Sequence, residues 1–413
     1  MRIAIAGAGI AGLAAAWLLE ESHDVLLLEE RANPGGNLRT FFPPDPVRMP
    51  EAVELGVRAV PLDPDSLVAR LSGVLGLDRG QWLPLPSGRL LLSDRGETDG
   101  SRCTASPFAP VRCEEAVRAA ALLAEQAHHW KSAHLDWEVP LREMVEDFDL
   151  SQHVKEVAVY SLPASTFGCT LEEAGLLSAR AVGELWAEDP AAPAPVSCRL
   201  RGGMQSLAQH LVSRSSRVQL ALGTALRMVD RHGGKPELTD TNGRRYRVDA
   251  LVLAVPADEA VRILSPHFGP LRARLASYAY RPLLYQAHLD PCHMPVDRDT
   301  WAPSTVTVHG PWAETTDWHP TKNGDLFVSQ VTHRKPRPRT PLASADFRTV
   351  QPTPGMLKAQ RELLRSQGDG GIFLAGHVTA PVNTLENALG SAIAVARQLA
   401  PRSRRLAQLL DDT

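Results

Sequence analysis

The residue types best suited to binding chemistry gather near the start of this sequence. Gly7, Gly9 and Gly12 form a G-x-G-x-x-G pattern. In a strand, turn and helix, the first glycine permits the turn, the second admits a diphosphate to the backbone, and the third allows close packing. Ile10 and Ala11 begin the helix, whose N-terminal N–H groups and partial positive charge attract an anion. The pattern predicts that this segment binds a dinucleotide.

Two adjacent carboxylates follow at the spacing expected for a ribose ligand. Glu29 lies 22 positions after Gly7, where a carboxylate accepts hydrogen bonds from both ribose hydroxyls and repels a 2′-phosphate. NADP is therefore disfavoured. Glu30 competes for the role, and a solvated charge at a strand end is the other alternative. We favour Glu29 because Gly35 and Gly36 follow it by six and seven positions.

A strand, a helix and a second strand must hold these residues. Hydrophobic periodicity predicts a strand over 3–6, a helix over 10–20 and a strand over 25–28, which make a βαβ unit. The glycine spacing inside this apolar start argues against a signal peptide. No other stretch reaches the roughly 18 uncharged apolar residues of a membrane span. We therefore expect a soluble protein with no integral membrane segment.

Size and composition narrow the class of protein further. With 413 residues, 44% of them hydrophobic, the chain is expected to form two domains. A net charge of -3 without a dense basic block disfavours nucleic acid and favours a small-molecule substrate. Five cysteines without a C-x-x-C pair argue against disulfides or zinc and predict a cytoplasmic location. The only metal-like cluster in the sequence is His128, His129, His134 and Asp136. The five-residue spacing of His129 and His134 does not put them on the same face of a helix, so we predict no metal site.

From Glu29 to Arg39 the sequence E-E-R-A-N-P-G-G-N-L-R resembles the flavin amine oxidase superfamily. That superfamily includes monoamine oxidases, protoporphyrinogen oxidase and phytoene-desaturase-like enzymes, in which a Gly-Gly pair passes the FAD diphosphate. The resemblance implies non-covalently bound FAD rather than NAD. Arg39 resembles the family's arginine after the glycines, although G-G-R has become G-G-N-L-R, and a surface arginine is the equal alternative. Glu54 to Gly56 is similar to the family's D-x-G segment near the flavin ring.

Later segments resemble the family in the family's own order. R-G-G-M-Q-S-L (201–207) is similar to a motif that opens a helix near the flavin, and 218–230 is similar to the segment that touches the adenine. The apolar run 246–256 predicts a strand ended by a proline. In the closing motif (371–396), the resemblance places a helix N-terminus at the flavin, where its dipole favours negative charge. The cofactor contacts that the resemblance implies here are Gly203, Met204, Leu226, Gly376, Glu386, Asn387 and Ala388.

The resemblance also implies the reaction. Flavin N5 accepts a hydride, oxygen regenerates the flavin, and oxidation of an amine or amide C–N bond is the first interpretation. Amine oxidases usually carry an aromatic residue in the loop after the last A-G, but here residues 377–382 contain none. His377 replaces the customary acid there and is a candidate proton acceptor, or else hydrogen-bonds the ribityl chain. Lys322 is the candidate for the family's water-positioning lysine.

Two other functions stay open. The first is an FAD-dependent dehydrogenase or desaturase that acts on C–C bonds of a lipid or polyketide-like substrate. The second is a non-catalytic dinucleotide-binding protein, against which the further motifs at Gly35, Gly203 and Gly376 argue. The sequence leaves the oligomeric state open.

The expected fold class is α/β with two discontinuous domains. A Rossmann-type (GR2-like) FAD-binding domain is predicted over 1–60, 198–262 and 356–403, and an α+β substrate domain over 61–197 and 263–355. Residues 264–354 are rich in aromatic residues and histidine, which suggests a pocket wall. They include Tyr280, Tyr285, His288, His293, Trp301, His309, Trp312, Trp318, His319 and His333. A strand meander with an aromatic core is the alternative.

Overall fold

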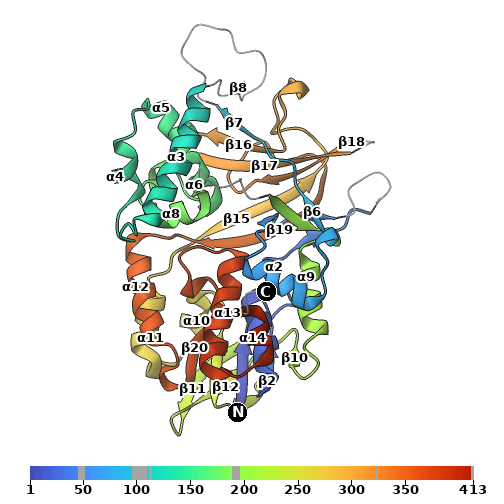
Figure 1. Ribbon diagram of the computed structural model, residues 1–413, viewed down its shortest axis with the longest axis vertical. Helices are drawn as coiled ribbons and strands as arrows, with labels where there is room; N and C mark the ends of the chain where they lie inside the picture. The colour runs from blue at the N-terminus through green and yellow to red at the C-terminus, as the bar shows by residue number, and fades with distance from the viewer. Residues whose placement is uncertain (45–51, 95–108, 111–113, 188–195, 322–323, 411–413) are drawn as a thin grey trace.

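A five-stranded parallel sheet organises the half of the molecule that holds the N-terminus (Figure 1). The computed structural model describes residues 1–44, 52–94, 109–110, 114–187, 196–321 and 324–410. The sheet has the order β10-β2-β1-β14-β20, and every neighbouring pair is parallel. Its strands are β1 (Arg2–Ala6), β2 (Asp24–Leu28), β10 (Gln219–Ala221), β14 (Ala250–Leu253) and β20 (Ile372–Leu374). Apolar runs such as A-L-V-L suit strands that are buried on both faces.

Alternate side chains of this sheet enter two separate cores. Ile3 and Ile5 of β1 pack with a helical layer, and Ala4 and Ala6 pack with a layer on the opposite face. The helical layer contains α1 (Ile10–Leu19), α9 (Gln205–Ser213) and α13 (Leu385–Leu399). The helices α2 (Leu67–Leu75) and α14 (Arg404–Leu410) contribute apolar side chains to the same core. The opposite layer contains the antiparallel strands β11 (Leu226–His232), β12 (Lys235–Asp240) and β13 (Arg245–Arg247), and α10 (Ala257–Ile263).

The other half of the molecule is built on a seven-stranded sheet of order β19-β15-β18-β17-β16-β7-β8 (Figure 1). Its pairs are antiparallel except for the parallel pair of β16 and β7. Its strands are β7 (Arg89–Ser93), β8 (Ala109–Pro110), β15 (Tyr280–His288), β16 (Ser304–His309), β17 (Trp312–Thr321), β18 (Gly324–Gln330) and β19 (Pro341–Val350).

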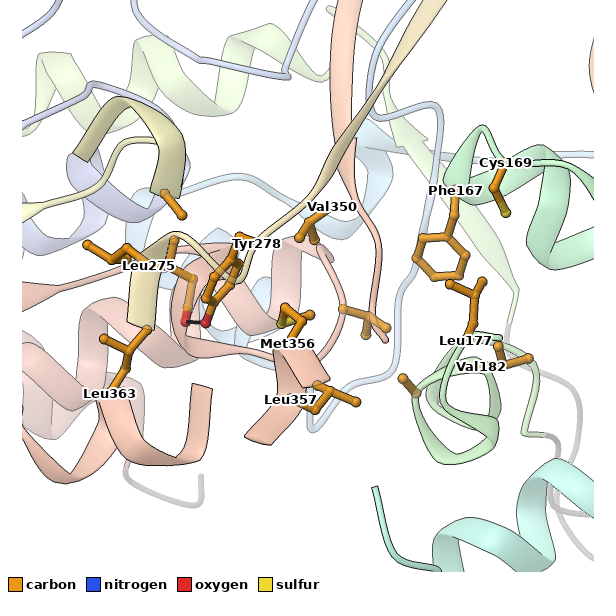
Figure 2. Packing of buried hydrophobic residues seen from close by; sticks show 14 of the residues in the cluster. Phe167, Cys169, Leu177, Val182, Leu275, Tyr278, Val350, Met356, Leu357 and Leu363 are labelled. Atoms are coloured by element: carbon orange, nitrogen blue, oxygen red, sulfur yellow. Dashed lines mark hydrogen bonds between the residues drawn. The ribbon is translucent and has the colours of Figure 1, made fainter. Parts of the chain in front are cut away.

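Helices cover part of this second sheet. They are α3 (Glu114–Ser132), α4 (Leu141–Glu146), α5 (Gln152–Val154), the π-helical turn η2 (Lys155–Tyr160), α6 (Ser161–Phe167), α7 (Leu171–Ala174) and α8 (Ala179–Trp186). Two helices, α11 (Gly269–Leu275) and α12 (Pro354–Arg365), connect the halves. Figure 2 shows Leu275 and Tyr278 beside Met356 and Leu363 in the core that both halves share.

Short elements complete the chain. Two small sheets contain β3 (Thr40–Phe41), β4 (Val53–Glu54), β5 (Val60–Pro61), β6 (Trp82–Pro84) and β9 (Ser197–Leu200). The 3-10 turns are η1 (Arg79–Gln81), η3 (Pro266–Phe268), η4 (Arg298–Thr300), η5 (Asp369–Gly371) and η6 (His377–Thr379).

The predicted βαβ unit and the α/β class are confirmed, with element bounds within a residue of those expected. The apolar run 246–256 is not one strand, because it divides between β13 of the antiparallel sheet and β14 of the parallel sheet. The domain boundaries stay a prediction, and α2 shares the core of α1 and α13 although it was expected in the substrate domain. Within the described ranges, no helix combines the length and apolar character that a bilayer crossing requires.

Candidate functional site

A cavity of about 2080 Å³ lies between the parallel sheet and the seven-stranded sheet. Pockets for drug-sized ligands usually measure about 300–1,000 Å³, so this one has room for a dinucleotide and a second molecule. Among the sequence-predicted residues, those that line it are Gly7, Gly9, Ile10, Ala11, Glu29, Glu30, Gly35, Gly36, Leu226, Gly376, His377, Glu386, Asn387 and Ala388. The fold thus brings together positions that are hundreds of residues apart in the sequence.

One end of the cavity is formed by two glycine loops that touch each other. The Gly35 N–H donates to the Ala8 carbonyl at 2.8 Å, and a Cβ on Gly36 would lie 3.0 Å from the Gly9 Cα. Gly36 also has a φ of +60°, which disfavours a side chain. The N-cap of α1 is Gly9, which offers no side chain to bind the first N–H groups of the helix. This narrow, side-chain-free cradle with free N–H donors fits a diphosphate.

Gly12 has a structural place behind this cradle. A Cβ at this position would lie 1.9 Å from the carbonyl oxygen of Gly7, so only glycine lets α1 approach the turn after β1. This geometry is the helix–strand packing that the spacing predicted for the third glycine. Gly12 does not line the cavity, and its effect on a ligand is therefore indirect.

Glu29 is held at the cavity by backbone hydrogen bonds. Its side chain is only 8% exposed, its Oε2 accepts from the Ala8 N–H at 2.7 Å, and its Oε1 accepts from the Arg31 N–H at 3.0 Å. Glu30 also lines the cavity but is exposed. The fixed carboxylate of Glu29, rather than the exposed one of Glu30, is suited to accept hydrogen bonds from a ribose.

Gly203 and Met204 lie one layer behind the cavity wall, although the sequence suggested direct cofactor contact. A Cβ on Gly203 would fall 2.3 Å from the Thr40 side chain, and the Met204 N–H donates to Glu54 Oε1 at 2.8 Å. Thr40 donates its hydroxyl to the same carboxylate at 2.9 Å. Glu54 is 3% exposed, and burial raises its pKa to about 7. These contacts fix the segment that leads to Gly56 in the wall.

Arg39 is likewise absent from the cavity wall. Its Nε donates to the Gly36 carbonyl at 3.4 Å, and its guanidinium carbon lies 5.1 Å from the centroid of the Phe347 ring. Desolvation is the largest cause that lowers its pKa from the ordinary value. Arg39 therefore supports the second glycine loop and an aromatic residue of the wall.

The first turn of α13 closes another side of the cavity. Glu386 accepts at Oε1 from the Leu67 N–H at 2.7 Å and at Oε2 from the Val68 N–H at 3.2 Å, so its carboxylate caps α2. Asn387 donates from Nδ2 to the Val382 carbonyl at 3.0 Å. These contacts fix the N-terminus of α13, with its partial positive charge, at the cavity.

His377 lies in the wall, in the turn η6 after β20. Its Nε2 lies 2.6 Å from the Tyr280 hydroxyl, which also accepts the Ala257 N–H at 2.8 Å. Burial lowers the pKa of His377 to about 4, so the imidazole is neutral near pH 7. Its suggested role as a proton acceptor stays a prediction. Lys322 lies outside the described residues.

Another part of the cavity wall contains aromatic and apolar side chains, next to polar ones such as Thr166 and Asp346. Phe167 and Leu283 lie there, and Tyr285 meets Phe347 edge to face with ring centroids 6.1 Å apart. Arg58 lies over the Tyr285 ring at 5.2 Å. Of the ten aromatic and histidine residues of 264–354 that were suggested for a pocket wall, Tyr280 and Tyr285 line the cavity. The others do not, and they lie on the antiparallel strands or their connections, as the alternative expected: His288, His293, Trp301, His309, Trp312, Trp318, His319 and His333.

The guanidinium of Arg58 is held by two residues of β17, which are distant from it in the sequence. Its Nη1 donates to Asp317 Oδ2 at 2.7 Å and to Thr315 Oγ1 at 3.1 Å. The carboxylate of Asp317 holds the pKa of Arg58 above its ordinary value against the effect of burial. Sequence reasoning missed Arg58 because its partners lie more than 250 positions away.

A group of potential metal ligands lies elsewhere in the described residues. One nitrogen, oxygen or sulfur atom from each of His288, Asp290 and Cys292 lies within 4.8 Å of the others. The protein already engages both imidazole nitrogens, since Nδ1 contacts the Asp290 carbonyl and Nε2 contacts Ser329 Oγ, each at 2.8 Å. The cluster therefore forms part of a hydrogen-bond network. His128, His129, His134 and Asp136 form no such group in the described residues.

Comparison with known proteins agrees with this geometry. The family model for flavin containing amine oxidoreductase matches residues 10–345. No curated protein matches the sequence at a significant level.

Solved structures with the same fold share little sequence with this chain. A double mutant of putrescine oxidase is 14% identical, with a TM-score of 0.71 over 97% of this chain and 100% of that one. The CLA-producing fatty acid isomerase from P. acnes is 15% identical, with a TM-score of 0.65 over 97% and 98%. A protein from Exiguobacterium sp. 255-15, assigned as a protoporphyrinogen oxidase, is 17% identical, with a TM-score of 0.64 over 96% and 98%. At such identities the likeness shows the fold alone.

Proposed function

The chain belongs to the flavin containing amine oxidoreductase family and is an FAD-dependent oxidoreductase, and on that premise we propose that it oxidises a C–N bond of a small amine. The family assignment removes the alternative of a non-catalytic dinucleotide-binding protein. The observation that carries the proposal is the continuous cavity, which runs from the glycine cradle to a wall formed by Tyr285 and Phe347.

The residues of the cradle fit FAD in type and position. We assign the diphosphate to the loops at Gly9 and Gly36 and the N-terminus of α1, because they offer N–H donors and no side chains. We assign a ribose to Glu29, the adenine end to Leu226, and the flavin end to Gly376 and the first turn of α13. FAD is held without a covalent bond in this proposal, and it supplies the hydride acceptor.

The protein's own residues then orient the substrate and exclude water. Tyr285 and Phe347 form the aromatic wall that the loop 377–382 lacks, because β15 and β19 bring them to the same end of the cavity. A neutral amine that loses a hydride from carbon and a proton from nitrogen becomes an imine, which water hydrolyses to a carbonyl and a smaller amine. Molecular oxygen takes up the two electrons and two protons as hydrogen peroxide.

Peroxide formation tests this proposal. The purified holoenzyme would be supplied in air with primary, secondary and cyclic amines, while oxygen uptake and peroxide are measured. We expect at least one amine to give peroxide and a carbonyl product in equal amounts. Turnover that occurs only with compounds lacking nitrogen would overturn the proposal.

Arg58 favours a second candidate, the oxidation of C–C bonds in an acidic, largely apolar molecule. A charged guanidinium beside the Tyr285 ring, in a wall that also holds Phe167, Leu283 and Phe347, is suited to a carboxylate and repels an ammonium group. Asp317 offsets part of this charge, because it is paired with the same group. The fatty acid isomerase with this fold acts on a carboxylic acid, which agrees with this candidate.

The two candidates differ in how they respond to Arg58→Met. If the substrate is an acid, the variant should raise KM about 30-fold and leave kcat nearly unchanged, since about 2 kcal/mol of a charge-assisted contact is lost. If the substrate is an amine, KM should stay the same or fall. The candidate with an acidic substrate fails if KM for every oxidised acid is unaffected by the substitution.

A further inference from the structure

We propose that Tyr280 is a positioning residue that holds His377 as one neutral tautomer, with its Nδ1–H available to donate to a polar oxygen of the bound dinucleotide. The proposal rests on the cofactor site and is independent of which substrate is oxidised. Tyr280 lies at the start of β15, 97 positions from His377, and both residues line the cavity.

The hydrogen-bond directions follow from the atoms that surround the Tyr280 hydroxyl. Its oxygen accepts the Ala257 N–H at 2.8 Å, so its own proton needs an acceptor. The Nε2 of His377 lies 2.6 Å away and is suited to that role. An imidazole that accepts at Nε2 and is neutral carries its proton on Nδ1. The backbone of α10 thereby sets the tautomer of a residue on another element.

The turn that carries His377 is held rigidly. The Tyr278 hydroxyl donates to the Val378 carbonyl at 2.6 Å (Figure 2), and Gln360 Nε2 donates to the Ala380 carbonyl at 2.8 Å. The Gly376 N–H donates to Ser391 Oγ at 2.7 Å. The backbone on both sides of the imidazole is therefore tied to α12, to α13 and to the turn between α11 and β15.

The remaining ring nitrogen faces the ligand space. Among the described residues no protein group is hydrogen-bonded to Nδ1 of His377, and the ring is part of the cavity wall. A Cβ on Gly376 would lie 3.6 Å from the Cβ of Ala11, which places this turn beside the N-terminus of α1. An N–H donor at this point is suited to a hydroxyl or phosphate oxygen of the dinucleotide.

The surroundings keep His377 uncharged. Burial has the largest effect and lowers its pKa to about 4, the carboxylate of Asp258 opposes this, and the guanidinium of Arg348 adds to it. Arg348 itself pairs with Asp258 and Glu259, so the two charges that act on His377 largely offset each other. A protonated imidazole would also leave the Tyr280 proton without an acceptor, since Ala257 donates to the same oxygen.

The experiment is a titration of apoprotein with FAD, followed by flavin fluorescence between pH 5 and pH 8.5. Wild-type protein should bind FAD with an affinity that changes less than about threefold over this range, because His377 stays neutral. Tyr280→Phe should weaken binding about tenfold at pH 8, since the tautomer is no longer fixed. Burial keeps the imidazole of His377 neutral in this variant too, but nitrogen NMR should show the Nε2-protonated tautomer mixed with the Nδ1-protonated tautomer that wild type holds.

Two further variants separate positioning from simple damage. Tyr278→Phe removes a hydrogen bond to the same turn without touching the imidazole, so it should leave the His377 tautomer as it is in wild type. His377→Gln should cost about as much as Tyr280→Phe, and the double variant should lose little more, because the two residues act through one contact. Additive losses, or an unchanged His377 tautomer in Tyr280→Phe, would overturn the proposal. Each apoprotein would first be checked for an unchanged thermal midpoint.

Discussion

The two ends of the cavity are built from different parts of the chain. The diphosphate end is mostly backbone, since Gly9, Gly35 and Gly36 touch each other and Glu29 is held by two backbone N–H groups. The opposite end is made of side chains from distant segments, such as Arg58 with its partners on β17. In the function proposed above, the first end fixes the cofactor, while the second can change its substrate without loss of the fold.

Gly36→Val should have the largest effect on the backbone-built end. The added side chain would lie against the Gly9 Cα, at a φ of +60° that valine avoids. We expect FAD affinity to fall at least about 100-fold, measured by flavin fluorescence, because the diphosphate loses its cradle. Gly73→Ala in α2 is the matched control, since a Cβ there meets no atom within 4 Å. Equal affinity in the two variants would contradict the assigned cradle.

Glu29→Ala should weaken FAD binding by about 30-fold, since charge-assisted hydrogen bonds to a ribose are lost. Glu30→Ala is the control, because that carboxylate is exposed and makes no comparable backbone contacts in the described structure. Calorimetric titration of the two apoproteins would measure both affinities. If Glu30→Ala has the larger effect, the ribose is assigned to the wrong carboxylate.

Tyr285→Leu tests the side-chain-built end. The substitution keeps an apolar group but removes the ring that meets Phe347 and Arg58. We expect kcat/KM to fall about tenfold, the effect of one lost aromatic contact, with FAD affinity within about twofold of wild type. Steady-state kinetics and a flavin titration measure the two effects. A large loss of FAD would show that the two ends are not independent.

Glu54 is the exception at the backbone-built end, because a buried carboxyl joins Thr40 to the Met204 N–H. Burial raises its folded pKa to about 7 from the ordinary value of 4.5. As pH rises through this window, the unfolded state loses the proton first, so the folded state loses stability.

Glu54→Gln should remove this loss of stability at higher pH, because glutamine does not ionise. Relative to wild type, its free energy of unfolding should improve by about 1 kcal/mol between pH 5 and pH 8, after allowance for the hydrogen bonds that a carboxylate keeps. Urea titrations at several pH values measure this difference. A difference that is independent of pH would show that Glu54 is ionised throughout.

The contrast between the ends also explains what the sequence could predict. The cradle and Glu29 lie within forty residues of each other, so their spacing alone could predict the strand, the turn, the helix and a candidate ribose ligand. The pairs Tyr280–His377 and Arg58–Asp317 join residues that are 97 and 259 positions apart. These residues meet only through the tertiary arrangement of distant segments, which no local sequence pattern predicts.

Motifs could locate segments without specifying their contacts. The G-G-M segment was expected at the cofactor, but Gly203 and Met204 contact Thr40 and Glu54 behind the wall. The position of Glu386 in the wall was expected, whereas its use as a cap for α2 was not, because α2 is 319 residues away in the sequence. The resemblance therefore predicted that the segment around Glu386 lies at the cavity, but the individual contacts of these residues depend on tertiary packing.

The central claim is that the cavity holds FAD beside a substrate that FAD oxidises, and anaerobic reduction tests it most directly. Purified holoenzyme would be mixed without oxygen with amines and, separately, with unsaturated acids, while the flavin absorption band is recorded. We expect that one class bleaches the band and that Tyr285→Leu slows the bleaching without loss of FAD. A band that no member of either class bleaches, in protein fully loaded with FAD, would contradict it.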